Sequence, residues 1–71
     1  MNKINAISII GKGFSDVGKE VSKVVEATGD KPAYIVVCYD QHEKMLDMDG
    51  NIKVKRGRVL KYKGMSVVVT L

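Results

Sequence analysis

The order of apolar and polar positions in the first half of the chain predicts a strand, a helix and a second strand. Residues 4–10 are rich in β-branched side chains, and the glycines that follow end this strand. Apolar residues then recur at steps of three and four over residues 15–28, which predicts an amphipathic helix that ends at Gly29. Residues 33–39 form another β-branched and aromatic run. Because a helix connects the two strands, we expect them to be parallel if they are neighbours.

The pattern after residue 39 predicts an antiparallel hairpin. Asp49-Gly50 is typical of a two-residue type I′ turn and would pair positions whose numbers sum to 99. One face would then carry the pairs Glu43–Arg56, Met45–Val54, Tyr39–Leu60 and Val37–Tyr62 and would cover the helix. The opposite face would be lined with lysine, in the pairs Lys44–Lys55, Leu46–Lys53, Cys38–Lys61 and Val36–Lys63. A bulge at Gly57 would shift this register in the part of the hairpin beyond it.

A turn at Gly64 leads into a last strand over residues 65–71, whose three consecutive valines indicate burial on both faces or at a subunit contact. We therefore predict an α+β fold of order β-α-β-β-β, a two-layer sandwich with one helix packed on a mostly antiparallel sheet. The chain has 71 residues, so we expect one small domain over residues 1–71. A core of this size is small, and self-association into a homo-oligomer is a common way to support it.

Charge is distributed unevenly along the chain. Residues 1–50 hold six Lys and eight Asp or Glu, a balance of −2, whereas residues 51–71 hold six basic residues and no acid. The sum is the net charge of +4. A patch of positive charge raises the local concentration of anionic partners. The six basic residues are Lys53, Lys55, Arg56, Arg58, Lys61 and Lys63. We predict that they contact nucleic acid phosphates, with little readout of base sequence, from a basic hairpin or sheet face.

Two other interpretations of the basic segment stay open. Lysines also guard exposed strands against edge-to-edge aggregation, and that role needs no ligand. The chain could instead be a protein-interaction module that docks an acidic partner or assembles through its edge strands. Such an interface needs apolar anchors, and the candidates are Tyr34, Leu46, Met45 and Met48. Tyr34 is also the better candidate for stacking on a base, because the register sends Tyr62 to the core.

Catalysis is the least favoured interpretation, and we expect no enzyme, no cofactor and no metal site. His42 is the only histidine and Cys38 the only cysteine. A metal site or catalytic set that needs two histidines or two cysteines therefore cannot form within one chain. We expect His42 on a solvated strand. The segment from Gly13 to Lys19 has the spacing of a phosphate-binding loop, but Glu20 stands where that loop needs a hydroxyl. A phosphate held near Lys12 and Lys19 at the helix start is a weaker possibility.

The remaining features bear on location. The apolar run near the start is too short for a signal peptide or a membrane span, so we expect no membrane partner. One cysteine allows no intramolecular disulfide, and a free thiol fits a reducing compartment. We therefore expect a cytoplasmic protein.

Overall fold

The computed structural model describes residues 5–48, 50 and 52–70. Its elements are β1 (Ala6–Ser8), η1 (Phe14–Asp16), α1 (Val17–Thr28), β2 (Tyr34–Cys38), α2 (Tyr39–Leu46), β3 (Ile52–Lys55), β4 (Arg58–Tyr62) and β5 (Met65–Thr70). The α+β class predicted from the sequence is confirmed. The order of the elements differs, because a second helix, α2, stands where the sequence predicted a strand.

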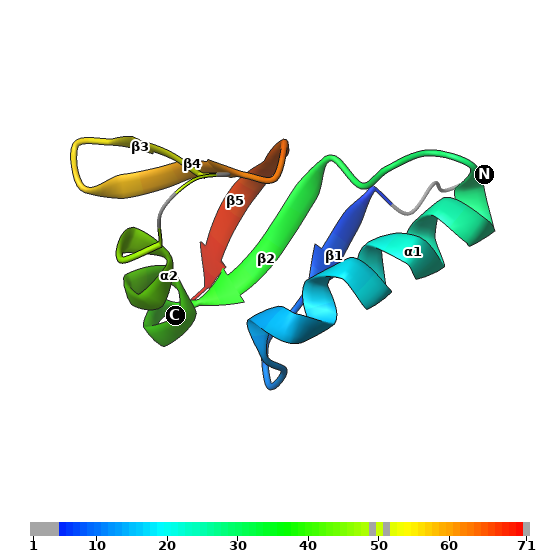
Figure 1. The fold of residues 1–71 in the computed structure, drawn as a ribbon, viewed down its shortest axis with the longest axis horizontal. Helices are drawn as coiled ribbons and strands as arrows, with labels where there is room; N and C mark the ends of the chain where they lie inside the picture. Colours follow the sequence, from blue (N-terminus) through cyan, green and yellow to red (C-terminus); the bar gives the residue numbers. More distant parts are fainter. Residues whose placement is uncertain (1–4, 49, 51, 71) are drawn as a thin grey trace.

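The strands form one mixed sheet in the order β1-β2-β5-β4-β3 (Figure 1). The predicted parallel pairing of the first two strands is confirmed, and β5 is also parallel to β2. The other two pairs, β4 with β5 and β3 with β4, are antiparallel. The sheet therefore has a parallel half, formed by β1, β2 and β5, and an antiparallel hairpin of β3 and β4 beyond it.

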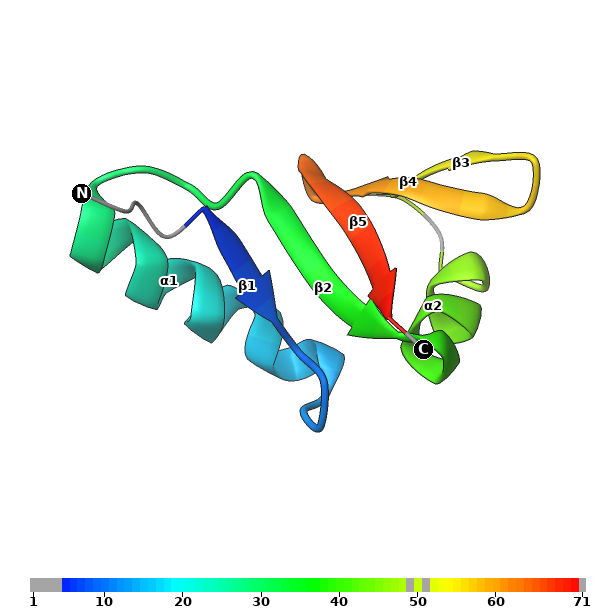
Figure 2. The same cartoon turned by 180° about the vertical axis from the view of Figure 1, so that it is seen from behind.

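Helix α1 lies along one face of the parallel half. Its buried residues Val17 and Val24 belong to the same core as Ile7, Ile35 and Val37 from the strands. The helix ends at Gly29 as predicted, since this residue has a φ of 81° and its N–H donates to the Val25 carbonyl oxygen at 2.7 Å. Figure 2 shows the other face of β1, β2 and β5, which the described helices leave uncovered.

The predicted strand over residues 39–48 is wrong, because Tyr39–Leu46 is the helix α2. Residues 40–44 are good helix formers or neutral and poor strand formers, and Gln41 caps the helix by accepting a hydrogen bond from the Cys38 N–H at 3.0 Å. The predicted register, in which the numbers of paired residues sum to 99, therefore does not form on either face. This removes the pairs Lys44–Lys55, Leu46–Lys53, Cys38–Lys61, Val36–Lys63, Glu43–Arg56, Met45–Val54, Tyr39–Leu60 and Val37–Tyr62. Asp49, half of the predicted turn, lies outside the described residues.

The hairpin instead joins β3 to β4 through Arg56-Gly57. The φ angles of 54° and 74° at these two residues are those of a type I′ turn. Gly57 therefore forms the turn and is not the site of a bulge. The irregularity lies further along, where pairs that sum to 113 near the turn give way to pairs that sum to 114. Strand β4 accordingly holds one residue more than β3 at this point, Leu60, which has no partner in the register.

The turn at Gly64 and the last strand are confirmed. Tyr62 pairs with Met65, and the residues between them, Lys63 and Gly64, have φ angles of 49° and 83°. Tyr62 is buried as predicted, with its ring 6.1 Å from that of Phe14. The three valines of β5 are not buried on both faces within one chain, since Val68 is 40% exposed.

Candidate functional site

Four basic side chains lie on one face of the β3–β4 hairpin. Lys53 and Lys55 are two positions apart on β3, and successive side chains of a strand point to opposite faces, so these two share a face. Their cross-strand partners are Lys61 and Arg58, which therefore lie on the same face. All four residues are exposed. We call Lys53, Lys55, Arg58 and Lys61 the basic hairpin face.

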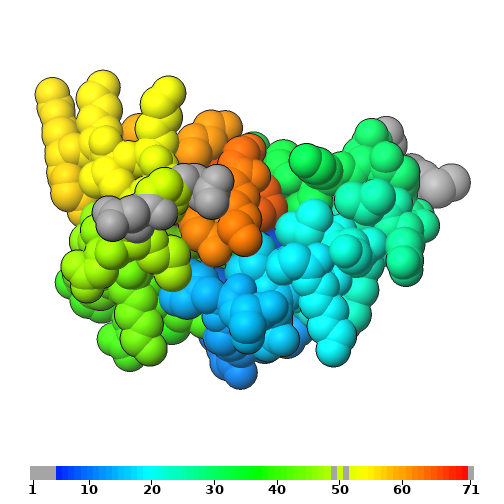
Figure 3. All heavy atoms as spheres, in the orientation of Figure 1, coloured from blue at the N-terminus to red at the C-terminus, as the bar shows by residue number. Residues whose placement is uncertain are grey.

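The opposite side of the hairpin is held by α2. Val59 is fully buried there, and its N–H donates a hydrogen bond of 3.1 Å to Nε2 of His42. Met45 of the same helix is also fully buried. In Figure 1 the helix lies below the hairpin, and in Figure 3 side chains of the hairpin stand out from the upper edge. The packing of α2 under one side therefore presents the basic side chains to solvent on the other.

The basic hairpin face carries uncompensated charge. Among the described residues none of its four side chains has an ion-pair partner. The two pairings Lys53–Lys61 and Lys55–Arg58 place like charges directly opposite one another. Such a pair destabilises a sheet by roughly 0.2–1 kcal/mol. An anion bound between the strands would remove this cost.

The start of α1 is different, because its nearby lysine is already neutralised. The Glu20 carboxylate forms two ion pairs, with Nζ of Lys12 and with Nζ of Lys23, each at an N–O distance of 3.2 Å. The hydrogen bonds from Lys23 and Lys12 hold the pKa of the Glu20 carboxyl below its ordinary value. The position that breaks the resemblance to a phosphate-binding loop thus has a structural role. Lys12 pairs with a carboxylate here, which disfavours the weaker alternative of a phosphate held at this helix start.

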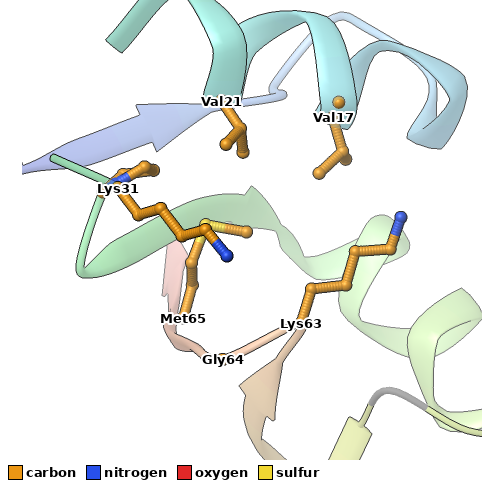
Figure 4. A pocket seen from close by; sticks show the side chains of 8 residues that line it. Val17, Val21, Lys31, Lys63, Gly64 and Met65 are labelled. Carbon is orange, nitrogen blue, oxygen red and sulfur yellow. The ribbon is translucent and has the colours of Figure 1, made fainter. Parts of the chain in front are cut away.

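The other two predicted basic residues are placed differently. Arg56 is exposed in the hairpin turn, next to the basic hairpin face. Lys63 lies in the β4–β5 turn, where its Nζ is 5.6 Å from the centroid of the Tyr62 ring. Figure 4 shows Lys63 extending toward Val17 of α1, on the covered side of the sheet. The structure therefore separates Lys63 from the basic hairpin face.

Lys63 lines a cavity of about 300 Å³ between α1 and the β4–β5 turn. Its apolar lining includes Val21 of α1 on one side and Met65 of β5 on the other, and Lys31 approaches from the side opposite Lys63 (Figure 4). The sequence offered no signal for this cavity, because the residues that form it come from three separate segments.

The apolar anchors predicted for a protein interface are mostly unavailable. Met45 is fully buried, and Leu46 and Met48 are partly buried against the core. Tyr34 is the exception, because 43% of it is exposed. It lies on the uncovered face of the sheet, since its neighbour Ile35 is fully buried on the face that α1 covers.

The two residues considered for catalysis have structural roles. The prediction that His42 lies on a solvated strand is wrong, because it is buried on the helix α2. Its Nε2 accepts the hydrogen bond from the Val59 N–H. Cys38 is half-buried with a free thiol at the start of α2. Gln41, for which the sequence predicts no role, donates from Nε2 to the carbonyl oxygens of Ile9 at 2.6 Å and Lys12 at 2.9 Å. Nothing in the sequence around Gln41 indicates these bonds, because their acceptors lie about 30 residues earlier in the chain.

Comparison with known proteins finds no match: no family model, no curated protein and no solved structure matches the chain. Within residues 5–48, 50 and 52–70, no helix is long and apolar enough to cross a membrane. No group of three or more His, Cys, Asp or Glu side chains in the same part of the chain is placed to hold a metal ion.

Proposed function

We propose that this protein is a small non-enzymatic binding protein that contacts nucleic acid phosphates through the basic hairpin face. One observation carries the proposal: four basic side chains lie as two like-charge cross-strand pairs on an exposed hairpin, and none has an acidic partner among the described residues. Nucleic acids supply closely spaced negative charges that match such a surface.

Protection of an edge strand explains this arrangement less well. Strand β3 is an edge strand of the sheet, so Lys53 and Lys55 would by themselves discourage its pairing with another chain. Of their partners on β4, Lys61 also pairs with Ser66 of β5 and is therefore not at an edge. Acidic residues opposite Lys53 and Lys55 would leave the edge charged and would stabilise the hairpin. Basic residues at both partner positions, Lys61 and Arg58, favour an anionic ligand.

Docking of an acidic protein surface is the other candidate. Of the anchors expected from the sequence, Met45 has no exposed surface and only Tyr34 is substantially exposed. A protein interface relies on a few well-buried apolar anchors, whereas phosphate binding requires only a density of positive charge. The four exposed basic residues of the basic hairpin face supply this density of charge.

The proposal is tested by fluorescence anisotropy with labelled single-stranded and duplex oligonucleotides over a series of salt concentrations. Four phosphate contacts predict that the logarithm of the affinity falls with the logarithm of salt concentration with a slope of about −3 to −4. The double variant Lys53→Glu/Lys61→Glu should bind on the order of tenfold or more weakly at low salt, with a slope shallower by about 2.

A matched control separates this site from net charge alone. Lys19→Glu/Lys31→Glu changes the net charge by the same amount, but Lys19 is on α1 and Lys31 precedes β2, so neither position belongs to β3 or β4. We expect this control to weaken binding only slightly and to leave the slope unchanged. Equal losses in the two double variants, or no binding of any oligonucleotide at low salt, would reject the proposal.

A further inference from the structure

We infer that the nucleic acid bound by this protein is single-stranded, and that its bases lie on the uncovered face of β1, β2 and β5, with Tyr34 as a stacking platform. This inference rests on the proposed function and adds the class of ligand and the path it takes. The pairing of the strands makes the basic hairpin face continuous with the uncovered sheet face.

The continuity can be followed residue by residue across the sheet. Tyr34 pairs with Ser66 on β5, Ser66 pairs with Lys61 on β4, and Lys61 pairs with Lys53 on β3. Directly paired residues lie on the same face, so Tyr34 and the two lysines form one row. Adjacent strands are about 4.8 Å apart, so the backbone of Lys61 is about 10 Å from that of Tyr34. A long, flexible lysine side chain covers part of that distance.

The surroundings of Tyr34 leave its ring accessible. Its two cross-strand neighbours are the small residues Ala6 and Ser66. The next row along the strands contains Val36 paired with Val68, and Val68 is 40% exposed. An aromatic ring, two valines and small side chains thus form an apolar surface beside two lysines. Stacked bases with a phosphate backbone along one side have the same combination of chemical groups.

The position of Tyr34 favours a single strand over a duplex. The bases of a duplex are stacked on one another and present only their edges in the grooves, so a tyrosine on the surface of a sheet cannot stack on them. Unpaired bases can be spread on a sheet and stacked on its aromatic side chains. A duplex could use the basic hairpin face but would leave Tyr34 without a role.

A second copy of this chain is a less suitable occupant of the same face. The described residues of the row that holds Tyr34 and of the row beside it include no acid: Ala6, Tyr34, Ser66, Lys61 and Lys53 in the first, and Ser8, Val36 and Val68 in the second. Two copies packed through this face would bring lysines together, and the described residues of these two rows offer no carboxylate to pair with them. A polyanion neutralises the lysines and covers the apolar surface at once.

The test replaces Tyr34 and leaves the lysines unchanged. For the variant Tyr34→Ala we expect an affinity for a single-stranded oligonucleotide that is roughly 5- to 150-fold lower, the range of one lost stacking contact. The salt slope should not change, because no phosphate contact is removed. Tyr34→Phe keeps the ring and should bind as the unaltered protein does. Tyr39→Ala removes another exposed tyrosine, on α2 and off this face, and should have no effect.

A direct signal of stacking is also available. The chain contains no tryptophan, so Tyr34→Trp introduces a single indole fluorophore at the proposed platform. Its fluorescence should be quenched by a single-stranded oligonucleotide and change little with a duplex of the same length. The fold of each variant is checked by circular dichroism, with little change expected because Tyr34 lies on the surface.

The outcomes separate the two proposals. If oligonucleotides bind, respond to Lys53→Glu/Lys61→Glu and yet bind equally to Tyr34→Ala, the inference is overturned and the proposed function stands. Tighter binding of duplex than of single strand would have the same meaning. If no oligonucleotide binds at all, the proposed function itself fails. If light scattering shows a dimer that Tyr34→Ala dissociates, a second copy occupies the face and the inference is overturned.

Discussion

The imidazole of His42 joins α2 to the hairpin, because its Nε2 accepts a hydrogen bond of 3.1 Å from the backbone N–H of Val59. Both residues are buried, and Val59 has no exposed surface. The bond lies close to the extra residue of β4, Leu60, where the register with β3 is irregular. A side chain of α2 thus satisfies a backbone donor of β4 next to this irregularity and fixes the hairpin against the helix.

Replacing His42 should therefore destabilise the fold. In His42→Leu the buried N–H of Val59 loses its acceptor, and an unsatisfied buried donor costs about 1–3 kcal/mol. Urea unfolding would measure this loss, and amide exchange by NMR should show faster exchange at Val59. Tyr39→Leu, an exposed position on the same helix, should change the unfolding free energy by less than about 0.5 kcal/mol. Equal stability of His42→Leu and the unaltered protein would contradict the structural role.

Gln41 should be as sensitive, for a related reason. Its amide accepts from the Cys38 N–H and donates to two carbonyl oxygens, of Ile9 and Lys12. Gln41→Ala removes all three bonds, and we expect a loss of about 2–4 kcal/mol. Gln41→Glu keeps the acceptor but directs a carboxylate oxygen at two carbonyls. It should remain destabilised at neutral pH and recover part of its stability as acid protonates the carboxyl, which thermal unfolding at several pH values would show.

These two residues also explain why α2 was not predicted. The residues that α2 buries are Gln41, His42 and Met45, and two of them are polar, so no apolar stripe marks the segment. Their hydrogen-bond partners are far away in the sequence and exist only after folding. The Asp49-Gly50 pair is a strong turn signal, and it predicts a hairpin despite the low strand propensity of residues 40–44. Helix α1 was predictable because its apolar residues recur regularly and Gly29 marks its end.

The candidate site was predictable in composition but not in arrangement. The sequence alone identifies the six basic residues of its last third. Which of them share a face depends on the position of the turn, and moving the turn from residues 49–50 to 56–57 changes every cross-strand pair. Only the folded chain shows that Lys61 faces Lys53 and that Lys63 extends toward α1.

Glycine substitutions at two positions should have opposite effects. Gly57 has a φ of 74° in the hairpin turn, and Gly18 is inside α1; a Cβ at either would meet no atom within 4 Å. Gly57→Ala should therefore cost about 1–2 kcal/mol through backbone strain alone. Gly18→Ala should instead stabilise the protein by about 0.5–1 kcal/mol, since alanine favours a helix. Thermal unfolding compares the two variants. A loss in Gly18→Ala or a gain in Gly57→Ala would show that the backbone differs at that position.

Stability should depend on pH through Glu20. Hydrogen bonds from Lys23 and Lys12 lower the pKa of this carboxyl in the folded state below its ordinary value of 4.5. A group whose pKa is lowered by folding contributes stability above its unfolded pKa and loses it as the pH falls through the folded value. The unaltered protein should therefore exceed Glu20→Gln in stability at pH 6, and the difference should shrink below pH 4.5. A difference that stays constant from pH 6 to pH 3 would mean that the two ion pairs contribute nothing.

The last prediction separates stability from binding at one residue. Lys61→Glu turns the repulsive pair with Lys53 into an attractive one and should raise the unfolding free energy by about 0.5–1 kcal/mol. The same change reverses a charge on the basic hairpin face, so affinity for an oligonucleotide should fall and the salt slope should become shallower by about 1. Lys61→Gln removes the repulsion without adding attraction and should lie between the two in both measurements. Urea unfolding and fluorescence anisotropy on the three proteins would give opposite rankings. A hairpin whose lysines serve only to keep an edge strand soluble would gain stability in the same way but would show no binding to lose.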